Sequence, residues 1–263
     1  MNFNLSRIPE RTPQPRNFGI TMISDRGLNL AETENMLSVA SAHIDMVKLA
    51  FGTAMVTPLL REKIQIYKSH QIPVFFGGLL FEAFIIRNQF DDYIRMLDDY
   101  EITFTEVSDG DINITHEKKC EYIRTLSSRG VVISEIGSQD KDKVKVTPPY
   151  KWIELMRAEL EAGSRYVIAE AKETGNEGLY RNSGEVREGL VQEILTKIPF
   201  EKIIWEAPEK DQQLYFIKLL GCNANLGNIL PKEVIPLEAM RLGLRGDSFD
   251  FFLNDKQERK DSF

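Results

Sequence analysis

The sequence of 263 residues has only two cysteines and three histidines, and neither residue type forms a recognisable catalytic or metal-binding motif. Cys120 and Cys222 are not part of a CxxC pair, which argues against a zinc ribbon or a redox dithiol. We interpret both thiols as reduced core or near-surface groups. His43, His70 and His116 fall within or beside expected helices, so we predict that none of them is catalytic.

The chain also lacks a basic surplus, a long apolar run and an apolar N-terminus. Its net charge is −7 and its pI about 5.2, whereas a general nucleic-acid-binding protein needs a basic face. No window approaches the roughly 18 apolar residues of a membrane span, and residues 1–16 are polar and Pro-rich, without a signal-peptide core. We therefore expect a cytoplasmic protein with no nucleic-acid or membrane partner. The sequence leaves open whether it forms a homo-oligomer.

About eight short apolar runs alternate along the chain with about eight segments of helical spacing. The runs are continuous, as in parallel strands that are covered by helices on both faces. Eight such units in about 250 residues match a (β/α)8 barrel. A doubly wound open sheet is the alternative, but no G-x-G-x-x-G follows the first run. We predict a single-domain α/β fold of the TIM-barrel type, with an extended arm over 1–16, the barrel over 17–250 and a polar tail over 251–263. The expected strands are 17–23, 44–49, 73–76, 102–107, 131–135, 166–170, 202–206 and 222–226.

Four of the expected strands have a glutamate as their last or next-to-last residue, namely Glu106, Glu135, Glu170 and Glu206. In such a barrel the C-terminal strand ends share one face, where the active site lies. Four carboxylates there would repel one another unless some are protonated, paired with a cation or bound to a metal. Their hard oxygen atoms suit Mg²⁺. A ring of ion pairs with Lys48, Lys172 and Arg245, which merely closes the end of the barrel, is the alternative interpretation.

A second feature suggests anion binding near the end of the chain. Gly227 and Asn228 follow the expected eighth strand and precede a helix, and phosphate sites in these barrels often use backbone N–H groups at that point. Arg245 lies between two glycines further on. We predict that a phosphate or sulfate binds near Gly227 and Asn228, with Arg245 close by.

Several segments together resemble the signature sequences of the phosphosulfolactate synthase family. They are KLAFGT (48–53), EVSDG (106–110), SEIG (134–137), EAP (206–208), NLGNI (225–229) and GLRGD (243–247). The resemblance runs in order from Asp25 to Asp247. It implies a (β/α)8 barrel, dependence on Mg²⁺, and addition of sulfite to phosphoenolpyruvate to give (2R)-2-phospho-3-sulfolactate. Archaeal members of this family act early in coenzyme M synthesis, and plant heat-stress-associated proteins share the fold.

This chemistry needs groups that neutralise two anionic substrates and a donor that protonates carbon. We expect three sets of residues to supply them: Glu106, Glu135 and Glu170 as Mg²⁺ ligands, Lys48, Lys172 and Glu206 as catalytic residues, and Asn225, Gly227, Asn228 and Arg245 as substrate-binding residues. One of the two lysines would be the proton donor.

The chain departs from the family pattern at three positions. Arg26 stands where the family usually has lysine, Lys172 where it usually has arginine, and Ser138 where lysine is common. The lysine at 172 keeps the charge but cannot make the bidentate contact of an arginine. Two other functions stay open: a barrel lyase that uses Lys48 as a Schiff base, and a non-catalytic or re-purposed relative, such as a stress-associated protein, that works through a partner.

Overall fold

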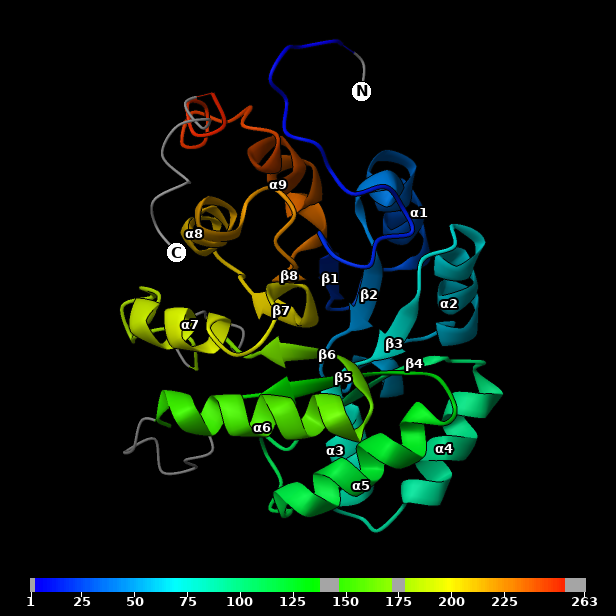
Figure 1. The fold of residues 1–263 in the computed structure, drawn as a ribbon. Helices are drawn as coiled ribbons and strands as arrows, with labels where there is room; N and C mark the ends of the chain where they lie inside the picture. Colours follow the sequence, from blue (N-terminus) through cyan, green and yellow to red (C-terminus); the bar gives the residue numbers. More distant parts are fainter. Residues whose placement is uncertain (1–2, 138–146, 172–177, 254–263) are drawn as a thin grey trace.

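The computed structural model describes residues 3–137, 147–171 and 178–253. Its strands form one parallel sheet in the order β3-β2-β1-β8-β7-β6-β5-β4. The sheet curls into a nearly closed barrel, and the helices cover its outer face (Figure 1). The predicted (β/α)8 TIM barrel is therefore confirmed.

Each strand of the barrel is short and buried. The strands are β1 (Thr21–Asp25), β2 (Met46–Leu49), β3 (Val74–Phe76), β4 (Phe104–Val107), β5 (Val131–Ile136), β6 (Ser164–Ala169), β7 (Ile203–Glu206) and β8 (Leu226–Ile229). The helices are α1 (Leu30–Ala40), α2 (Leu60–Ser69), α3 (Gly78–Ile85), α4 (Phe90–Asp99), α5 (His116–Ser127), α6 (Pro149–Ala162), α7 (Glu188–Leu195), α8 (Lys210–Leu220) and α9 (Val234–Arg241).

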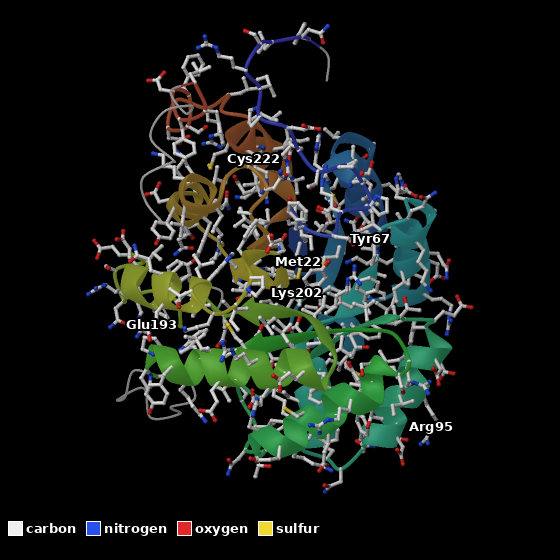
Figure 2. All side chains as sticks on the ribbon, viewed as in Figure 1. Met22, Tyr67, Arg95, Glu193, Lys202 and Cys222 are labelled. Atoms are coloured by element: carbon white, nitrogen blue, oxygen red, sulfur yellow. The ribbon has the colours of Figure 1, made fainter. Side chains whose placement is uncertain are left out.

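Apolar side chains fill the barrel and the layer between the sheet and the helices. Met22 and Tyr67 have no exposed surface and lie inside the molecule, whereas Arg95 and Glu193 lie at its outside (Figure 2). Helix starts follow local signals, as at α5, where the Thr115 hydroxyl accepts a hydrogen bond from the Lys118 N–H and caps the helix. No helix in the described ranges is both long and apolar enough to cross a bilayer.

The eighth strand begins later than predicted, and this moves several residues. We expected 222–226 as the strand and Gly227 and Asn228 as a loop, but β8 runs from Leu226 to Ile229. The Gly-Asn pair resembles a turn signal. It lies within a strand, where a glycine fits because the barrel interior is crowded at this position. A Cβ atom on Gly227 would lie 2.6 Å from Met22 Cε and 2.9 Å from Ile204 Cγ2.

Candidate active site

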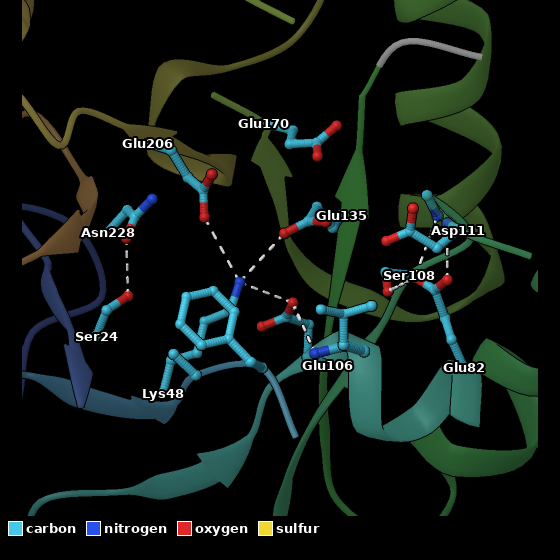
Figure 3. Close-up of a pocket in the computed structure, with 15 residues that line it drawn as sticks. Ser24, Lys48, Glu82, Glu106, Ser108, Asp111, Glu135, Glu170, Glu206 and Asn228 are labelled. Carbon is cyan, nitrogen blue, oxygen red and sulfur yellow. Dashed lines mark hydrogen bonds and ion pairs between the residues drawn. The ribbon is translucent and has the colours of Figure 1, made fainter. Parts of the chain in front are cut away.

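Lys48 of β2 lies at the centre of a buried charge cluster in the mouth formed by the C-terminal strand ends (Figure 3). Its Nζ atom is 2.8 Å from Glu106 Oε1, 3.1 Å from Glu135 Oε2 and 3.5 Å from Glu206 Oε1. These three glutamates come from β4, β5 and β7, as the strand-end pattern predicts. One lysine therefore faces three carboxylates, which leaves an excess of negative charge in a buried site.

The charge excess changes the acidity of the groups that form it. Burial by itself would lower the pKa of Lys48, but the carboxylates of Glu106, Glu135 and Glu206 outweigh it and raise that pKa well above its usual value. Burial raises the pKa of Glu106 from 4.5 to about 8, although Lys48 offsets part of the effect. Burial likewise raises the pKa of Glu206. The cluster thus holds Lys48 as an ammonium ion and favours uptake of a further cation or proton.

The two oxygen atoms of Glu106 have different surroundings. Oε1 accepts hydrogen bonds from Lys48 and from the Gly78 N–H, the latter at 3.0 Å. Oε2 is buried and has no hydrogen-bond partner among the described residues. Leaving a buried acceptor unsatisfied costs about 1–3 kcal/mol. This oxygen, which belongs to a residue lining the pocket, therefore marks a position where a bound ligand, a proton or a metal would be stabilised.

Glu170 follows β6 and lines the same pocket as Glu206. Its carboxylate lies against the main chain of Gly137, where a Cβ atom would come within 1.5 Å of Glu170 Oε2. A side chain at position 137 would therefore displace the Glu170 carboxylate. The residue after Glu170 holds Glu206 in place, because the Ala171 N–H donates a hydrogen bond to Glu206 Oε2 at 3.1 Å. The predicted convergence of four glutamates at one end of the barrel is confirmed.

The opposite side of the pocket is lined by the uncharged Ser24 and Asn228, and the basic Arg26 contacts Asn228. Asn228 Oδ1 accepts hydrogen bonds from Ser24 Oγ at 3.0 Å and from Arg26 Nη2 at 3.2 Å. The Arg26 guanidinium also lies 5.8 Å from the centre of the Phe51 ring. In Figure 3, Ser24 and Asn228 lie on one side of Lys48 and Glu135 on the other. The pocket thus has an acidic side and a side that suits an anion.

Sequence reasoning missed Glu82, which lies in α3 and also lines the pocket. It is 3% exposed, and burial raises the pKa of its carboxyl group. Its oxygens accept from Ser108, Gly110 and Asp111 in the loop after β4. The available signal was a single charged residue in the otherwise apolar helix GLLFEAFI.

Asn225 does not lie in the pocket, where we expected it to bind substrate. Its Oδ1 accepts from the Ile20 N–H at 3.0 Å and its Nδ2 donates to the Ile203 carbonyl at 3.0 Å. Ile20 precedes β1 and Ile203 begins β7, so Asn225 joins strands at the end of the barrel opposite to the pocket. The late start of β8 explains the error, because Asn225 comes before this strand.

Gly227 and Arg245 also differ from their predicted placement at a loop anion site. Gly227 belongs to β8, and its carbonyl accepts from the Ala207 N–H at 3.0 Å. Arg245 lies 3.9 Å from Asp247, which also pairs with Lys210 at the start of α8. Neither residue is among those that line the pocket. The segment after α9 packs on α8, so of the expected substrate-binding residues only Asn228 reaches the mouth. Lys172 and Ser138 lie outside the described residues.

The pocket offers oxygen donors for a metal, although no group of three or more His, Cys, Asp or Glu in the described ranges is arranged as a ready metal site. Mg²⁺ usually takes one or two carboxylates and completes its shell with water and substrate oxygens. The unpartnered Glu106 Oε2 and the nearby Glu135 are donors of this kind. The residues present therefore fit a Mg²⁺ ion that binds together with substrate.

Comparison with known proteins identifies the family. A family model described as (2R)-phospho-3-sulfolactate synthase (ComA) matches residues 9–247. The chain is 36% identical over 244 residues to the phosphosulfolactate synthase of Methanothermobacter thermautotrophicus, covering 91% of this chain and 95% of that protein. It is 37% identical over 250 residues to the one from Bacillus subtilis, covering 95% and 99%. The chain belongs to the phosphosulfolactate synthase family.

Membership of the phosphosulfolactate synthase family makes the chain an enzyme of this type. Among solved structures, 3-keto-L-gulonate-6-phosphate decarboxylase from Vibrio cholerae matches with a TM-score of 0.53 and 12% identity over 89% of this chain and 99% of that one. 3-Hexulose-6-phosphate synthase from Salmonella typhimurium matches with a TM-score of 0.52 and 13% identity over 88% and 97%. At such low identity these two likenesses show the barrel fold alone.

Proposed function

We propose that the chain adds sulfite to phosphoenolpyruvate and forms (2R)-2-phospho-3-sulfolactate, assisted by Mg²⁺. The observation that carries the proposal is the buried Lys48 with its three glutamates at the mouth of the barrel. The segments that resemble the family's signature sequences supply all four of these residues. Membership of the phosphosulfolactate synthase family supports the same reaction.

The reaction has to bring two anions together. The sulfur lone pair of bisulfite forms a bond to C3 of phosphoenolpyruvate, and the C2–C3 double-bond electrons move towards the carboxylate to give an enediolate. A proton is then delivered to C2, so bisulfite and phosphoenolpyruvate together contain every atom of the product. Charge builds up on the substrate carboxylate during the first step. Fixed positive charge near that carboxylate would lower the barrier most.

Lys48 fits the task of stabilising this charge. Its three carboxylate neighbours raise its pKa, so it stays an ammonium ion while the enediolate forms. The same raised pKa argues against the Schiff-base alternative, because a lysine that attacks a carbonyl must first lose its proton. As an ammonium ion Lys48 could also supply the proton to C2, because the enediolate carbon is a far stronger base than an amine, and the proton that bisulfite loses would then restore the ammonium ion.

The side of the pocket that bears Asn228, Ser24 and Arg26 would receive the phosphate group. Ser24 and Asn228 line it, and the Arg26 guanidinium, which donates to Asn228 Oδ1, adds positive charge there. The glutamates on the other side would repel a phosphate, so the polarity of the pocket sets the orientation of phosphoenolpyruvate. Lys172, expected as a second cation, lies outside the described residues and stays a prediction.

Glu106 and Glu135 would hold the Mg²⁺ ion, and Glu170, the third expected ligand, lines the same pocket. When bound, the ion would supply positive charge opposite the developing enediolate. The glutamates themselves position Lys48 and give the mouth its negative charge when it is empty. Glu206 contributes to this set through its contact with Lys48.

The direct test is to incubate the protein with phosphoenolpyruvate, sulfite and Mg²⁺ and to follow the product by mass spectrometry. We expect phosphosulfolactate from the wild type, much less in EDTA, and none above background from Lys48→Met. Borohydride trapping with carbonyl substrates should label no lysine. A folded protein that binds neither phosphoenolpyruvate nor Mg²⁺ would contradict the proposal and favour a non-catalytic relative.

A further inference from the structure

Strands β3 and β4 are the two ends of the sheet, and no strand ladder joins them in the described part of the chain. They lie side by side, so the barrel has a seam at this point. At the active-site end, one hydrogen bond crosses the seam from α3 to β4. Gly78 N–H, at the start of α3, donates to Glu106 Oε1 of β4 at 3.0 Å.

Glu82 bridges the same seam in the opposite direction (Figure 3). It lies one turn further along α3 and accepts from the loop that follows β4. Its Oε1 accepts from the Ser108 hydroxyl and from the Gly110 N–H, the latter at 3.1 Å, and its Oε2 accepts from the Asp111 N–H at 2.8 Å. Both carboxylate oxygens are therefore occupied by donors from one loop. That loop begins directly after β4.

Glu106 is thus held from two sides. Gly78 fixes its Oε1 directly, and Glu82 fixes Ser108, two residues further along the chain. In this arrangement Glu106 Oε1 meets Lys48, whereas Oε2 has no hydrogen-bond partner among the described residues. We propose that Glu82 is a positioning residue that closes the barrel seam and holds Glu106 in the orientation that the reaction needs. This inference rests on the proposed function of the pocket.

Direct contact between Glu82 and substrate is the competing explanation, and the geometry argues against it. The three donors from Ser108, Gly110 and Asp111 already occupy both oxygens. A carboxylate would also repel phosphoenolpyruvate and sulfite. Glu82 therefore acts through the loop.

Glu82→Gln tests the proposal while keeping the shape of the side chain. The amide has one acceptor oxygen, and its NH₂ group would face an N–H or a hydroxyl, so at least one of the three contacts with the loop is lost. We expect kcat to fall on the order of tenfold to a hundredfold, as for a small displacement of a catalytic group, with KM close to the wild-type value. Amide hydrogen exchange at Gly110 and Asp111 should become faster.

Glu238→Gln is the matched control, because Glu238 is 7% exposed and its Oε1 pairs with Arg11 at 3.0 Å at the other end of the barrel. It should lower the melting temperature and leave kcat unchanged. Ser108→Ala is a second, milder variant. If Glu82 acts through Ser108, the double variant Glu82→Gln/Ser108→Ala should lose less activity than the product of the two single losses.

Three results would overturn the proposal. Unchanged kcat and KM in Glu82→Gln would mean that Glu82 contributes only to stability. A rise in KM alone would mean that it contacts substrate. Unchanged hydrogen exchange at Gly110 and Asp111 would mean that it does not hold the loop. This last measurement needs no turnover, so it tests the seam contact even if the wild type makes no phosphosulfolactate and the proposed reaction is wrong.

Discussion

At the N-terminal end of the barrel, Arg11 and Arg241 lie near one buried glutamate, Glu238. At the C-terminal end, a single lysine, Lys48, is surrounded by three glutamates. Arg11 pairs with Glu238 at 3.0 Å, and Arg241 donates to the carbonyls of Cys222 and Ala224 at 2.7 Å each. Burial alone would raise the pKa of Glu238, but the charge and hydrogen bond of Arg11 together with the charge of Arg241 lower that pKa below its usual value. Burial raises the pKa of Glu106 at the other end.

The difference teaches which buried charges serve the fold and which serve the reaction. Glu238 also has a buried oxygen without a hydrogen-bond partner in the described residues, so an unpartnered oxygen does not by itself identify the site. Its charge is balanced by Arg11 and Arg241. Glu106 shares Lys48 with Glu135 and Glu206, so the described residues leave an excess of negative charge around it, and the residue lines the pocket. Burying unbalanced negative charge costs folding free energy. Such charge is therefore expected at a binding or active site, where a bound ligand compensates it.

The largest effect should come from removing the one cation of the cluster. Lys48→Met should lower kcat by a factor on the order of 10³ or more, since it removes the main fixed positive charge near the substrate carboxylate. Its three carboxylates would then have no cation partner among the described residues, so the variant should be less stable at pH 8 than at pH 6. Turnover assays and thermal melts at both pH values measure this. A variant that keeps a tenth of the activity would show that Lys48 is not central.

At the other end, Arg241→Met should reduce stability and not turnover. Arg241 is fully buried and donates to several carbonyls before β1 and β8. Because each acceptor left unsatisfied costs about 1–3 kcal/mol, we expect the free energy of unfolding to fall by about 3 kcal/mol or more. Urea denaturation and kcat of the remaining folded protein provide the measurements. A loss of kcat at full stability would show that the two ends are coupled.

A smaller effect concerns pH. The folded pKa of Glu106, about 8, lies above its ordinary value of 4.5, so between these values the folded state binds more protons than the unfolded state. The protonated Glu106 therefore stabilises the folded state at low pH, and this stabilisation is lost as the pH rises from 4.5 to about 8. In EDTA, the melting temperature of the wild type should fall more between pH 6 and pH 9 than that of Glu106→Gln. Parallel curves for the two proteins would be inconsistent with a raised pKa.

The sequence predicted the barrel and the glutamate cluster because both depend on local patterns that the fold preserves. Continuous apolar runs indicate parallel strands. A residue at the C-terminal end of such a strand lies at the mouth of the barrel, independently of the conformation of the loops. Glu106, Glu135 and Glu206 were predictable for that reason, as was Lys48 near the end of its strand.

The errors arose where position depends on packing between distant segments. Gly227 resembles a turn residue in the sequence, but it lies in β8, where Met22 and Ile204 leave no room for a Cβ atom. A shift of four residues in this strand placed Asn225 at the wrong end of the barrel. Glu82 was missed because periodicity does not reveal that one residue of an apolar helix faces a loop more than twenty residues away in sequence.

The most direct test makes the same substitution at both ends, Glu106→Gln and Glu238→Gln, and measures kcat with Mg²⁺ and the melting temperature in EDTA at pH 8. Glutamine at 106 still accepts from Gly78 and removes excess negative charge, so we predict a loss of kcat on the order of 10²–10³ with an unchanged or higher melting temperature. Glu238→Gln should keep kcat and lower the melting temperature. If Glu106→Gln instead lowers the melting temperature and keeps its activity, the cluster around Lys48 is a structural ion-pair network and the account is wrong.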